Sequence, residues 1–135
     1  GYMIVQYAAA SMVSENKVYA HPASVDSIPS SANQEDVVSM GTTAARKAGM
    51  IVQNTLSVLA MELLTACQAI DIRRRLNTHG QGITPLHEAL YQHVREKVAF
   101  FEIDREIWPD IAEVEKMVRS GELLEIVKEY MPEFQ

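Results

Sequence analysis

The chain has 135 residues, the size of one ordinary domain, and 47% of them are hydrophobic, which is too many for a disordered chain. Twelve Lys and Arg side chains against eighteen Asp and Glu side chains give a formal net charge of −6. A surface that binds nucleic acid needs an excess of positive charge, so we expect no nucleic-acid partner.

The N-terminal part predicts one helix followed by a loop. Apolar side chains recur with helical spacing over residues 2–20. This helix should end before Pro22, because the residue that precedes a proline is disfavoured in the helical conformation. Residues 21–36 contain a second proline, Pro29, and four serines, and they predict a loop. The chain opens without Met inside an amphipathic element, so we expect it to be a piece of a longer protein.

A very long helix is predicted over residues 36–75. Apolar side chains surround most of its circumference over residues 56–70, so this part should be buried on all sides. The apolar stretch contains Glu62 and is shorter than the roughly 20 residues that a transmembrane helix needs, so no membrane span is expected. Such a helix would measure about 60 Å, against a diameter of about 37 Å for a compact domain of this length. We therefore expect an elongated helical bundle that other parts of a larger chain, or other subunits, complete.

The C-terminal part, residues 84–135, predicts three further helices. The first should run from Pro85 to Glu106, with Thr84 as its N-cap and proline at the first helical position. Two short amphipathic helices should follow over residues 110–119 and 121–130. No segment alternates with the period of two that marks a strand, so the predicted class is all-α.

The densest polar cluster is the run Ser-Ala-Asn-Gln-Glu-Asp at residues 31–36. Ser31 and Gln34 have the spacing of a capping box, which is one interpretation of the run. In the other interpretation, Glu35 points into a pocket from a helix N-terminus. There its carboxylate stays ionised and fixed in direction, and it could hold a substrate N–H group or exchange a proton.

Other candidate residues suggest no further chemistry. His79, His87 and His93 lack the spacing of a metal site, so no metal is expected. Cys67 lies among apolar residues of the long helix and has no second cysteine to pair with, so it should behave as a small buried hydrophobe. Glu62 should pair with a cation from a neighbouring helix or subunit.

Several runs of residues together form a family-specific pattern. Residues 14–17 are Ser-Glu-Asn-Lys, residues 20–29 are Ala-His-Pro-Ala-Ser-Val-Asp-Ser-Ile-Pro, and residues 31–36 are the polar run described above. This pattern closely resembles the histidine-type members of the aromatic amino-acid lyase and aminomutase family. Weaker similarities extend to the C-terminal Pro-Asp-Ile and Arg-Ser-Gly, at residues 109–111 and 119–121. The resemblance covers essentially the whole chain and corresponds to the last quarter of such an enzyme, which is mainly helical.

The resemblance implies a cytoplasmic homotetramer that eliminates ammonia from L-histidine to give trans-urocanate. The family uses a methylidene-imidazolone prosthetic group made from an internal Ala-Ser-Gly triplet. This sequence contains no such triplet, so the group must come from residues outside this chain. We therefore expect the isolated chain to be inactive.

The resemblance also implies roles for four residues. Glu35 matches the glutamate that faces the imidazole in histidine-specific members, so it is the candidate catalytic and substrate-binding residue. Met3 matches a residue that lines the substrate pocket, although it could equally be a methionine of the helix core. Asn33 and Gln34 are expected to support the loop.

Three alternatives to the histidine-type assignment stay open. Histidine-type members often have His after Glu-Asp, whereas this chain has Val37. A tyrosine or phenylalanine ammonia-lyase, or an aminomutase of the same family, therefore remains possible. The chain could also be a non-catalytic helical oligomerisation domain.

Overall fold

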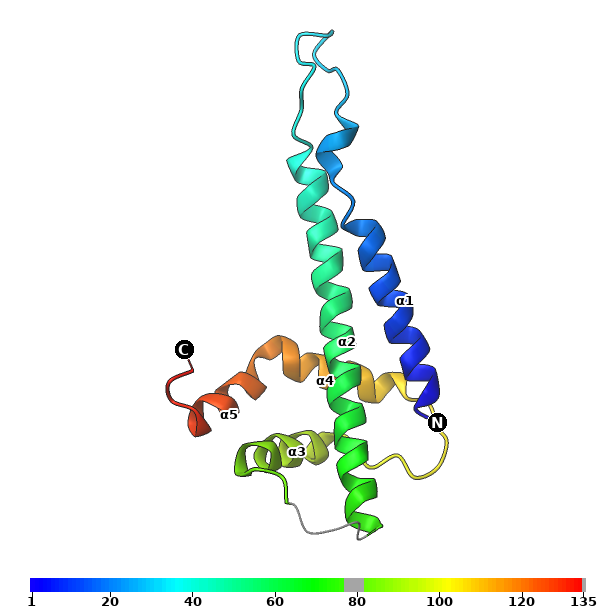
Figure 1. Ribbon diagram of the computed structural model, residues 1–135, viewed down its shortest axis with the longest axis vertical. Coiled ribbons are helices and arrows are strands. Elements are labelled where there is room, and N and C mark those ends of the chain that lie inside the picture. The colour runs from blue at the N-terminus through cyan, green and yellow to red at the C-terminus, as the bar shows by residue number, and fades with distance from the viewer. Residues whose placement is uncertain (77–81, 135) are drawn as a thin grey trace. The chain divides into compact units, whose positions relative to one another are not determined.

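The protein folds into helices joined by irregular segments, as the computed structural model in Figure 1 shows. The structure describes residues 1–76 and 82–134. The elements in chain order are α1 (Met3–Tyr19), the 3₁₀ helix η1 (Ala23–Asp26), α2 (Gly41–Arg75), α3 (Pro85–Lys97), α4 (Trp108–Ser120) and α5 (Glu122–Tyr130). Within the described residues there is no β-strand. The predicted all-α class with one long helix, here of 35 residues, is confirmed.

The chain divides into two compact units. The first unit contains residues 1–5 and residues 56–135, and the second contains residues 6–55. The start of α1 and the C-terminal part of α2 therefore belong to the first unit. The rest of α1, the loop and the N-terminal part of α2 form the second unit.

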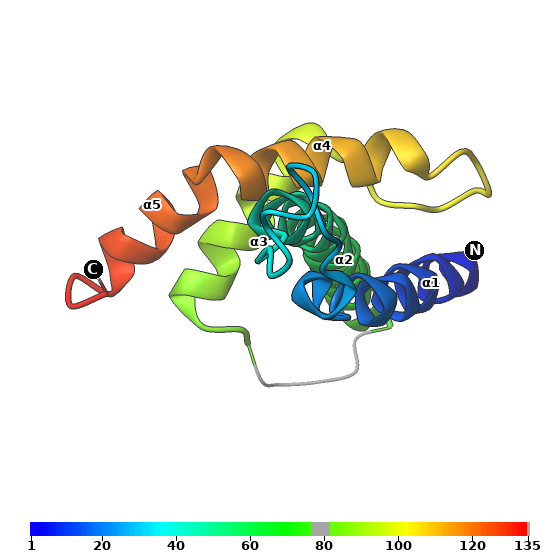
Figure 2. The same cartoon turned by 90° about the horizontal axis from the view of Figure 1, so that it is seen from above.

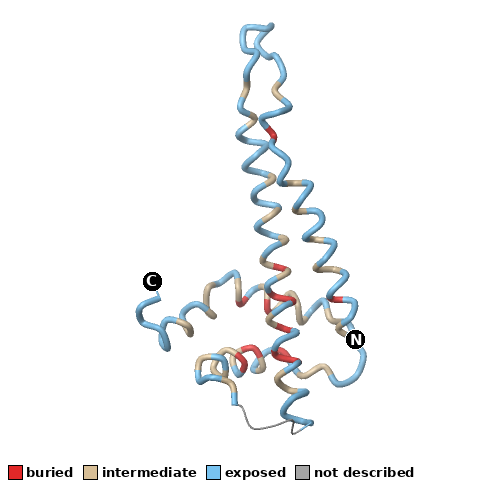
Figure 3. The backbone as a smooth tube through the Cα atoms, in the orientation of Figure 1, coloured by how far each residue is buried: buried red, intermediate tan, exposed pale blue. Residues whose placement is uncertain are grey.

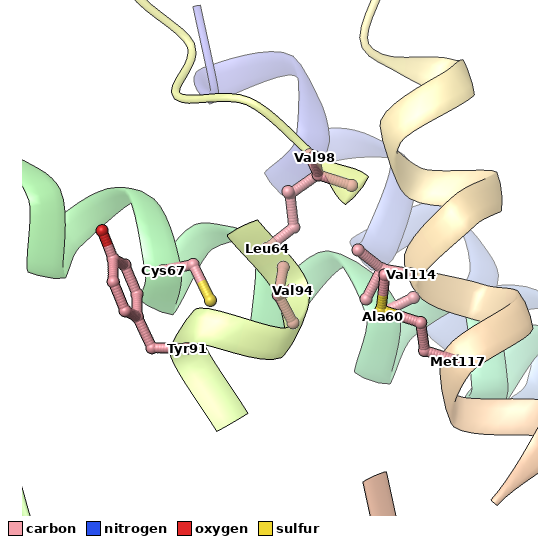
Figure 4. Close-up of a cluster of buried hydrophobic side chains, with 8 residues drawn as sticks. All are labelled: Ala60, Leu64, Cys67, Tyr91, Val94, Val98, Val114 and Met117. Carbon is pink, nitrogen blue, oxygen red and sulfur yellow. The ribbon is translucent and has the colours of Figure 1, made fainter. Parts of the chain in front are cut away.

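The core of the first unit forms on one stripe of α2 (Figure 4). Ala60, Leu64 and Cys67 lie three and four residues apart, so they share one face of the helix. Side chains from α3, from the segment that follows it and from α4 cover this face: Tyr91, Val94, Val98, Val114 and Met117. Burying an apolar side chain of this size contributes roughly 1.5–3 kcal/mol, so this cluster holds α2, α3 and α4 together.

The last two helices follow one another across a bend at Gly121 (Figure 2). Gly121 has φ of 82°, a left-handed conformation that glycine adopts without a steric penalty. α5 packs against both α3 and α4. The expected positions of these two short helices are confirmed.

Two helix boundaries differ from the prediction. α2 begins at Gly41 rather than at residue 36, so the loop is longer than expected. α3 ends at Lys97 rather than at Glu106, because Val98 adopts an extended conformation with φ of −119° and ψ of 113°. The predicted N-cap is confirmed, since the Thr84 side chain accepts a hydrogen bond from the backbone N–H of His87.

The long helix is not buried on all sides by the described part of the chain (Figure 3). Leu59 is 45% exposed, although its neighbour Ala60 is fully buried. By length and composition alone, α2 contains a window of mean hydropathy 1.4 that could cross a membrane, and 33% of that window is buried. One such helix is weak evidence for a span, because the core helix of a globular protein passes the same test. The expected absence of a membrane span therefore stays a prediction.

Candidate functional site

A tight turn presents the polar run of the loop. The backbone N–H of Ser30 donates to the carbonyl of Glu35 at 2.7 Å, and the N–H of Glu35 donates back to the carbonyl of Ser30 at 3.3 Å. Inside this pair of bonds, the N–H of Gln34 donates to the carbonyl of Ser31 at 3.1 Å. The turn is therefore closed by three backbone hydrogen bonds.

The tip of the turn has an unusual backbone conformation. Ser31, Ala32 and Asn33 have φ of 50°, 55° and 65°, which is the left-handed region that residues with a Cβ rarely occupy. Asn tolerates this region better than other residues do, whereas Ala32 has no polar side chain to compensate for it. A strained backbone of this kind persists only where surrounding interactions hold it, and such segments cluster at ligand-binding sites.

A serine at the base of the loop supplies some of these interactions. The Ser27 hydroxyl accepts a hydrogen bond from the backbone N–H of Val38 at 2.7 Å and donates to the carbonyl of Asp36 at 3.4 Å. This side chain therefore connects the two arms of the loop below the turn. The sequence alone does not mark Ser27 as important, because a serine among four in a loop carries no specific signal.

Glu35 occupies the end of the turn and not a helix N-terminus. The helix starts at Gly41, so the capping-box interpretation of Ser31 and Gln34 is wrong, and so is the expectation that a helix dipole fixes the Glu35 carboxylate. The Glu35 side chain is exposed, and its Oε2 accepts a hydrogen bond from the Ser30 hydroxyl at 3.4 Å. An ionised carboxylate has about four acceptor positions, so Glu35 retains the capacity to accept an N–H group from a ligand.

Asn33 and Gln34 are also exposed in this turn. Gln34 contributes through its backbone N–H, and Asn33 through its tolerance of the left-handed conformation. Their expected role in supporting the loop stays a prediction.

Met3 lies in the other compact unit, at the first residue of α1. Its side chain is 72% exposed, so it is not a methionine of the helix core within this chain. The interpretation that remains is an exposed residue that could line a pocket.

The remaining candidates take part in local contacts. Burial raises the pKa of the Cys67 thiol, as expected for an inert buried cysteine. His87 Nδ1 lies 2.7 Å from the Thr84 hydroxyl, and His93 Nε2 lies 3.3 Å from a carboxylate oxygen of Glu122. Across residues 1–76 and 82–134, no group of His, Cys, Asp and Glu side chains could hold a metal ion. His79 lies outside the described residues, and Glu62 is exposed without an ion-pair partner among them.

One largely buried polar cluster was not predicted from the sequence. Asp71 of α2 accepts hydrogen bonds from the Tyr91 hydroxyl at 2.5 Å and from Arg95 Nε at 2.8 Å. Burial, and then the Asp71 carboxylate, raise the pKa of Tyr91. The available signal was the spacing of Tyr91 and Arg95, which places both on one face of α3. The cluster joins α3 to α2.

Comparison with known proteins identifies the family. The family model "Aromatic amino acid lyase" matches residues 1–96. A histidine ammonia-lyase from Caldanaerobacter subterraneus subsp. tengcongensis is 55% identical over 129 residues, which cover 96% of this chain and 24% of that protein. A histidine ammonia-lyase from Streptococcus gordonii is 49% identical over 130 residues, which cover 95% of this chain and 25% of that protein.

Solved structures agree with this result. The crystal structure of histidine ammonia-lyase from Trypanosoma cruzi superposes with a TM-score of 0.87 at 48% identity, covering 96% of this chain and 25% of that one. The tyrosine aminomutase from Streptomyces globisporus superposes with a TM-score of 0.84 at 37% identity, and the match covers 96% of this chain and 24% of that one.

The family model and the solved structures thus point to one class of protein, the aromatic amino acid lyases and their structural neighbours. The chain belongs to the aromatic amino acid lyase family. It spans about a quarter of the length of the relatives that it matches.

Proposed function

We propose that this chain is the C-terminal quarter of a histidine ammonia-lyase, which eliminates ammonia from L-histidine to give trans-urocanate. The observation that carries the proposal is the 55% identity to a histidine ammonia-lyase across 96% of the chain. The tyrosine aminomutase matches the same length of chain at 37% identity. The histidine-type enzyme is therefore the better-supported parent.

In this proposal Glu35 recognises the substrate ring. A carboxylate can accept the N–H of an imidazole, whereas a phenyl ring offers no such donor. The closed turn and the Ser27 contacts fix the backbone that carries Glu35, and Asn33 and Gln34 support that backbone. Met3 supplies an apolar surface for the face of the ring, which suits a polarizable thioether.

The prosthetic group of the family would come from outside this chain. The 135 residues contain no Ala-Ser-Gly triplet, so they do not provide the residues that form a methylidene-imidazolone. That group supplies an electrophile that makes the amino group a better leaving group. The present residues would bind and orient the substrate, and the isolated chain should not turn over histidine. We further propose that the parent enzyme is a cytoplasmic homotetramer and needs no metal.

The substitution Glu35→Gln in the longer protein tests this function. An amide retains the size of the side chain but loses the charge that favours an imidazole N–H, so kcat/KM for L-histidine should fall by about 10- to 100-fold. The free energy of unfolding should change by less than about 0.5 kcal/mol, because the side chain is exposed. Urocanate absorbance measures the first quantity and urea unfolding measures the second.

The neighbouring acid Asp36 provides the matched control. Asp36→Asn removes the same charge from the same exposed loop, and it should change kcat/KM by less than about 2-fold. Equal losses of turnover in the two variants, or a loss of stability in Glu35→Gln that matches its loss of turnover, would show that Glu35 has only a structural role.

A substrate panel separates the alternatives. Because the chain is also similar to a tyrosine aminomutase, the alternative to test is a parent enzyme that acts on tyrosine or phenylalanine. Preferred turnover of L-tyrosine or L-phenylalanine by the longer protein would assign it to that branch of the family. No turnover of any aromatic amino acid by that protein would favour a non-catalytic helical oligomerisation domain.

A further inference from the structure

Two side chains anchor the first turn of α1. Tyr2 packs against the core cluster, and Val5 is only 5% exposed. These two residues are three apart, so they lie on the same side of the turn. The backbone N–H of Val5 donates to the carbonyl of Tyr2 at 3.0 Å. Met3 lies between them and is 72% exposed, so the anchoring of Tyr2 sets the position of its backbone.

Phe101 holds the Tyr2 ring. The two rings meet edge to face, with centroids 5.3 Å apart and planes at 85°. This is a favoured geometry for aromatic pairs, and such pairs contribute about 0.5–1.5 kcal/mol beyond the area they bury. The Tyr2 hydroxyl has no hydrogen-bond partner within the described part of the chain. The ring is therefore the part of Tyr2 that carries the contact.

Gln68 of α2 in turn fixes Phe101. Its side-chain Nε2 donates to the Phe101 carbonyl at 2.9 Å, and the Phe101 backbone N–H donates to its Oε1 at 3.1 Å. Gln68 is 7% exposed, so both of its polar groups depend on this pairing. One amide thus satisfies both backbone groups of Phe101 and attaches the extended segment after α3 to α2.

We propose that Gln68 and Phe101 are positioning residues that act through Tyr2 on Met3. This inference rests on the proposed function, in which Met3 contacts the substrate ring. The contacts form a continuous chain from the Gln68 amide to the Phe101 backbone, from the Phe101 ring to the Tyr2 ring, and from Tyr2 to the next residue. Neither Gln68 nor Phe101 needs to touch the substrate to affect how firmly its ring is held.

The test compares two adjacent phenylalanines in the full-length enzyme. Phe101→Leu removes the ring contact with Tyr2 but keeps an apolar side chain and the backbone bonds to Gln68. We expect KM for L-histidine to rise by about 5- to 10-fold with kcat changed by less than about 2-fold, because misplacement of Met3 weakens binding of the ring. Phe100 instead stacks under the Arg75 guanidinium, 3.7 Å from the ring centroid, so Phe100→Leu should leave both constants within about 2-fold.

Variants of Tyr2 test the link between Phe101 and Met3 in this series of contacts. Tyr2→Leu should reproduce the KM increase of Phe101→Leu, whereas Tyr2→Phe keeps the ring and should retain the KM of the unmodified enzyme. A KM for Tyr2→Phe as high as that of Tyr2→Leu would overturn the proposal, and so would equal KM values for Phe101→Leu and Phe100→Leu.

A double-mutant cycle shows whether the effect passes through Met3. In a Met3→Ala background, Phe101→Leu should change KM by less than about 2-fold, because the group that it positions is already gone. An undiminished 5- to 10-fold increase in that background would show that Phe101 acts by another route.

A second measurement separates this inference from the proposed function. If the full-length protein does not turn over histidine, the proposed function fails, and the resonance of the isotope-labelled Met3 methyl group then reports the positioning directly. Phe101→Leu should shift or broaden this resonance, and Phe100→Leu should not. An unchanged Met3 resonance in Phe101→Leu would overturn the inference, whatever the substrate.

Discussion

Asp71 and Arg95 form a largely buried ion pair, in which each charge is compensated by the other. Arg95 Nη2 lies 2.7 Å from Asp71 Oδ2, and the Tyr91 hydroxyl donates to the other carboxylate oxygen. Arg95 Nη1 also donates to the carbonyl of Val98 at 3.1 Å, directly after the end of α3. Because removing a buried charge from water is costly, an Arg95 side chain without Asp71 would be an unpaired cation in the protein.

The substitution Asp71→Asn should therefore lower the free energy of unfolding by about 3 kcal/mol, measured by urea unfolding followed by circular dichroism. Glu102→Gln is the matched control, since Glu102 pairs with Arg75 at 2.9 Å but both side chains are more than half exposed. An exposed pair contributes at most about 1 kcal/mol. Equal effects of the two substitutions would mean that burial of Asp71 does not determine its contribution.

The geometry of the segment that carries Glu35 could not be read from its sequence. The polar run at residues 31–36 lies in an exposed turn, and its role as a substrate site stays a prediction. The same spacing of Ser31 and Gln34 is compatible with a capping box and with a tight turn, because both bring residues three apart together. Three successive left-handed residues without glycine could not be predicted, since local preference disfavours this conformation at each of them.

At the scale of the helices, the ends were harder to predict than the apolar faces. The stripe of Ala60, Leu64 and Cys67 follows from helical periodicity alone. The end of α3 at Lys97 does not, because the residues that follow would suit a helix. The segment after α3 instead forms two hydrogen bonds, one donated and one accepted by the side-chain amide of Gln68, which lies 33 residues earlier in the chain. A contact of that range leaves no local signal in the sequence.

The start of α3 does have a local signal, and it gives a prediction at this scale. Thr84→Ala removes the acceptor for the backbone N–H of His87 and should lower the free energy of unfolding by about 1 kcal/mol. Thr65→Ala is the control, because the Thr65 hydroxyl donates within α2 to the carbonyl of Met61 at 2.7 Å. Alanine favours a helix interior, so this change should be neutral or slightly stabilising. An equal change in the melting temperature of the two variants would contradict the capping role of Thr84.

At the scale of the whole chain, apolar side chains remain uncovered. Large apolar residues are exposed on α1 and on α2: Met3, Ile4, Tyr7, Val13, Val18, Met50, Val52, Leu59 and Ile72. The chain spans about a quarter of the relatives that it matches. We propose that the other parts of the parent enzyme cover these side chains. The expectation that the apolar part of α2 is buried on all sides would then apply to the assembled protein and not to these 135 residues.

The isolated 135-residue chain should accordingly self-associate, because exposed apolar patches of this extent promote association. Light scattering should report a mass above that of one chain, increasing with concentration. Val52→Lys together with Leu59→Lys should shift the distribution toward the monomer, since both side chains are exposed on α2 and a lysine there is solvated in the monomer but desolvated in a contact. The control, Lys128→Ala, changes an exposed residue outside these apolar positions and should leave association unchanged. A concentration-independent monomer for the unmodified chain would show that these exposed side chains do not drive self-association.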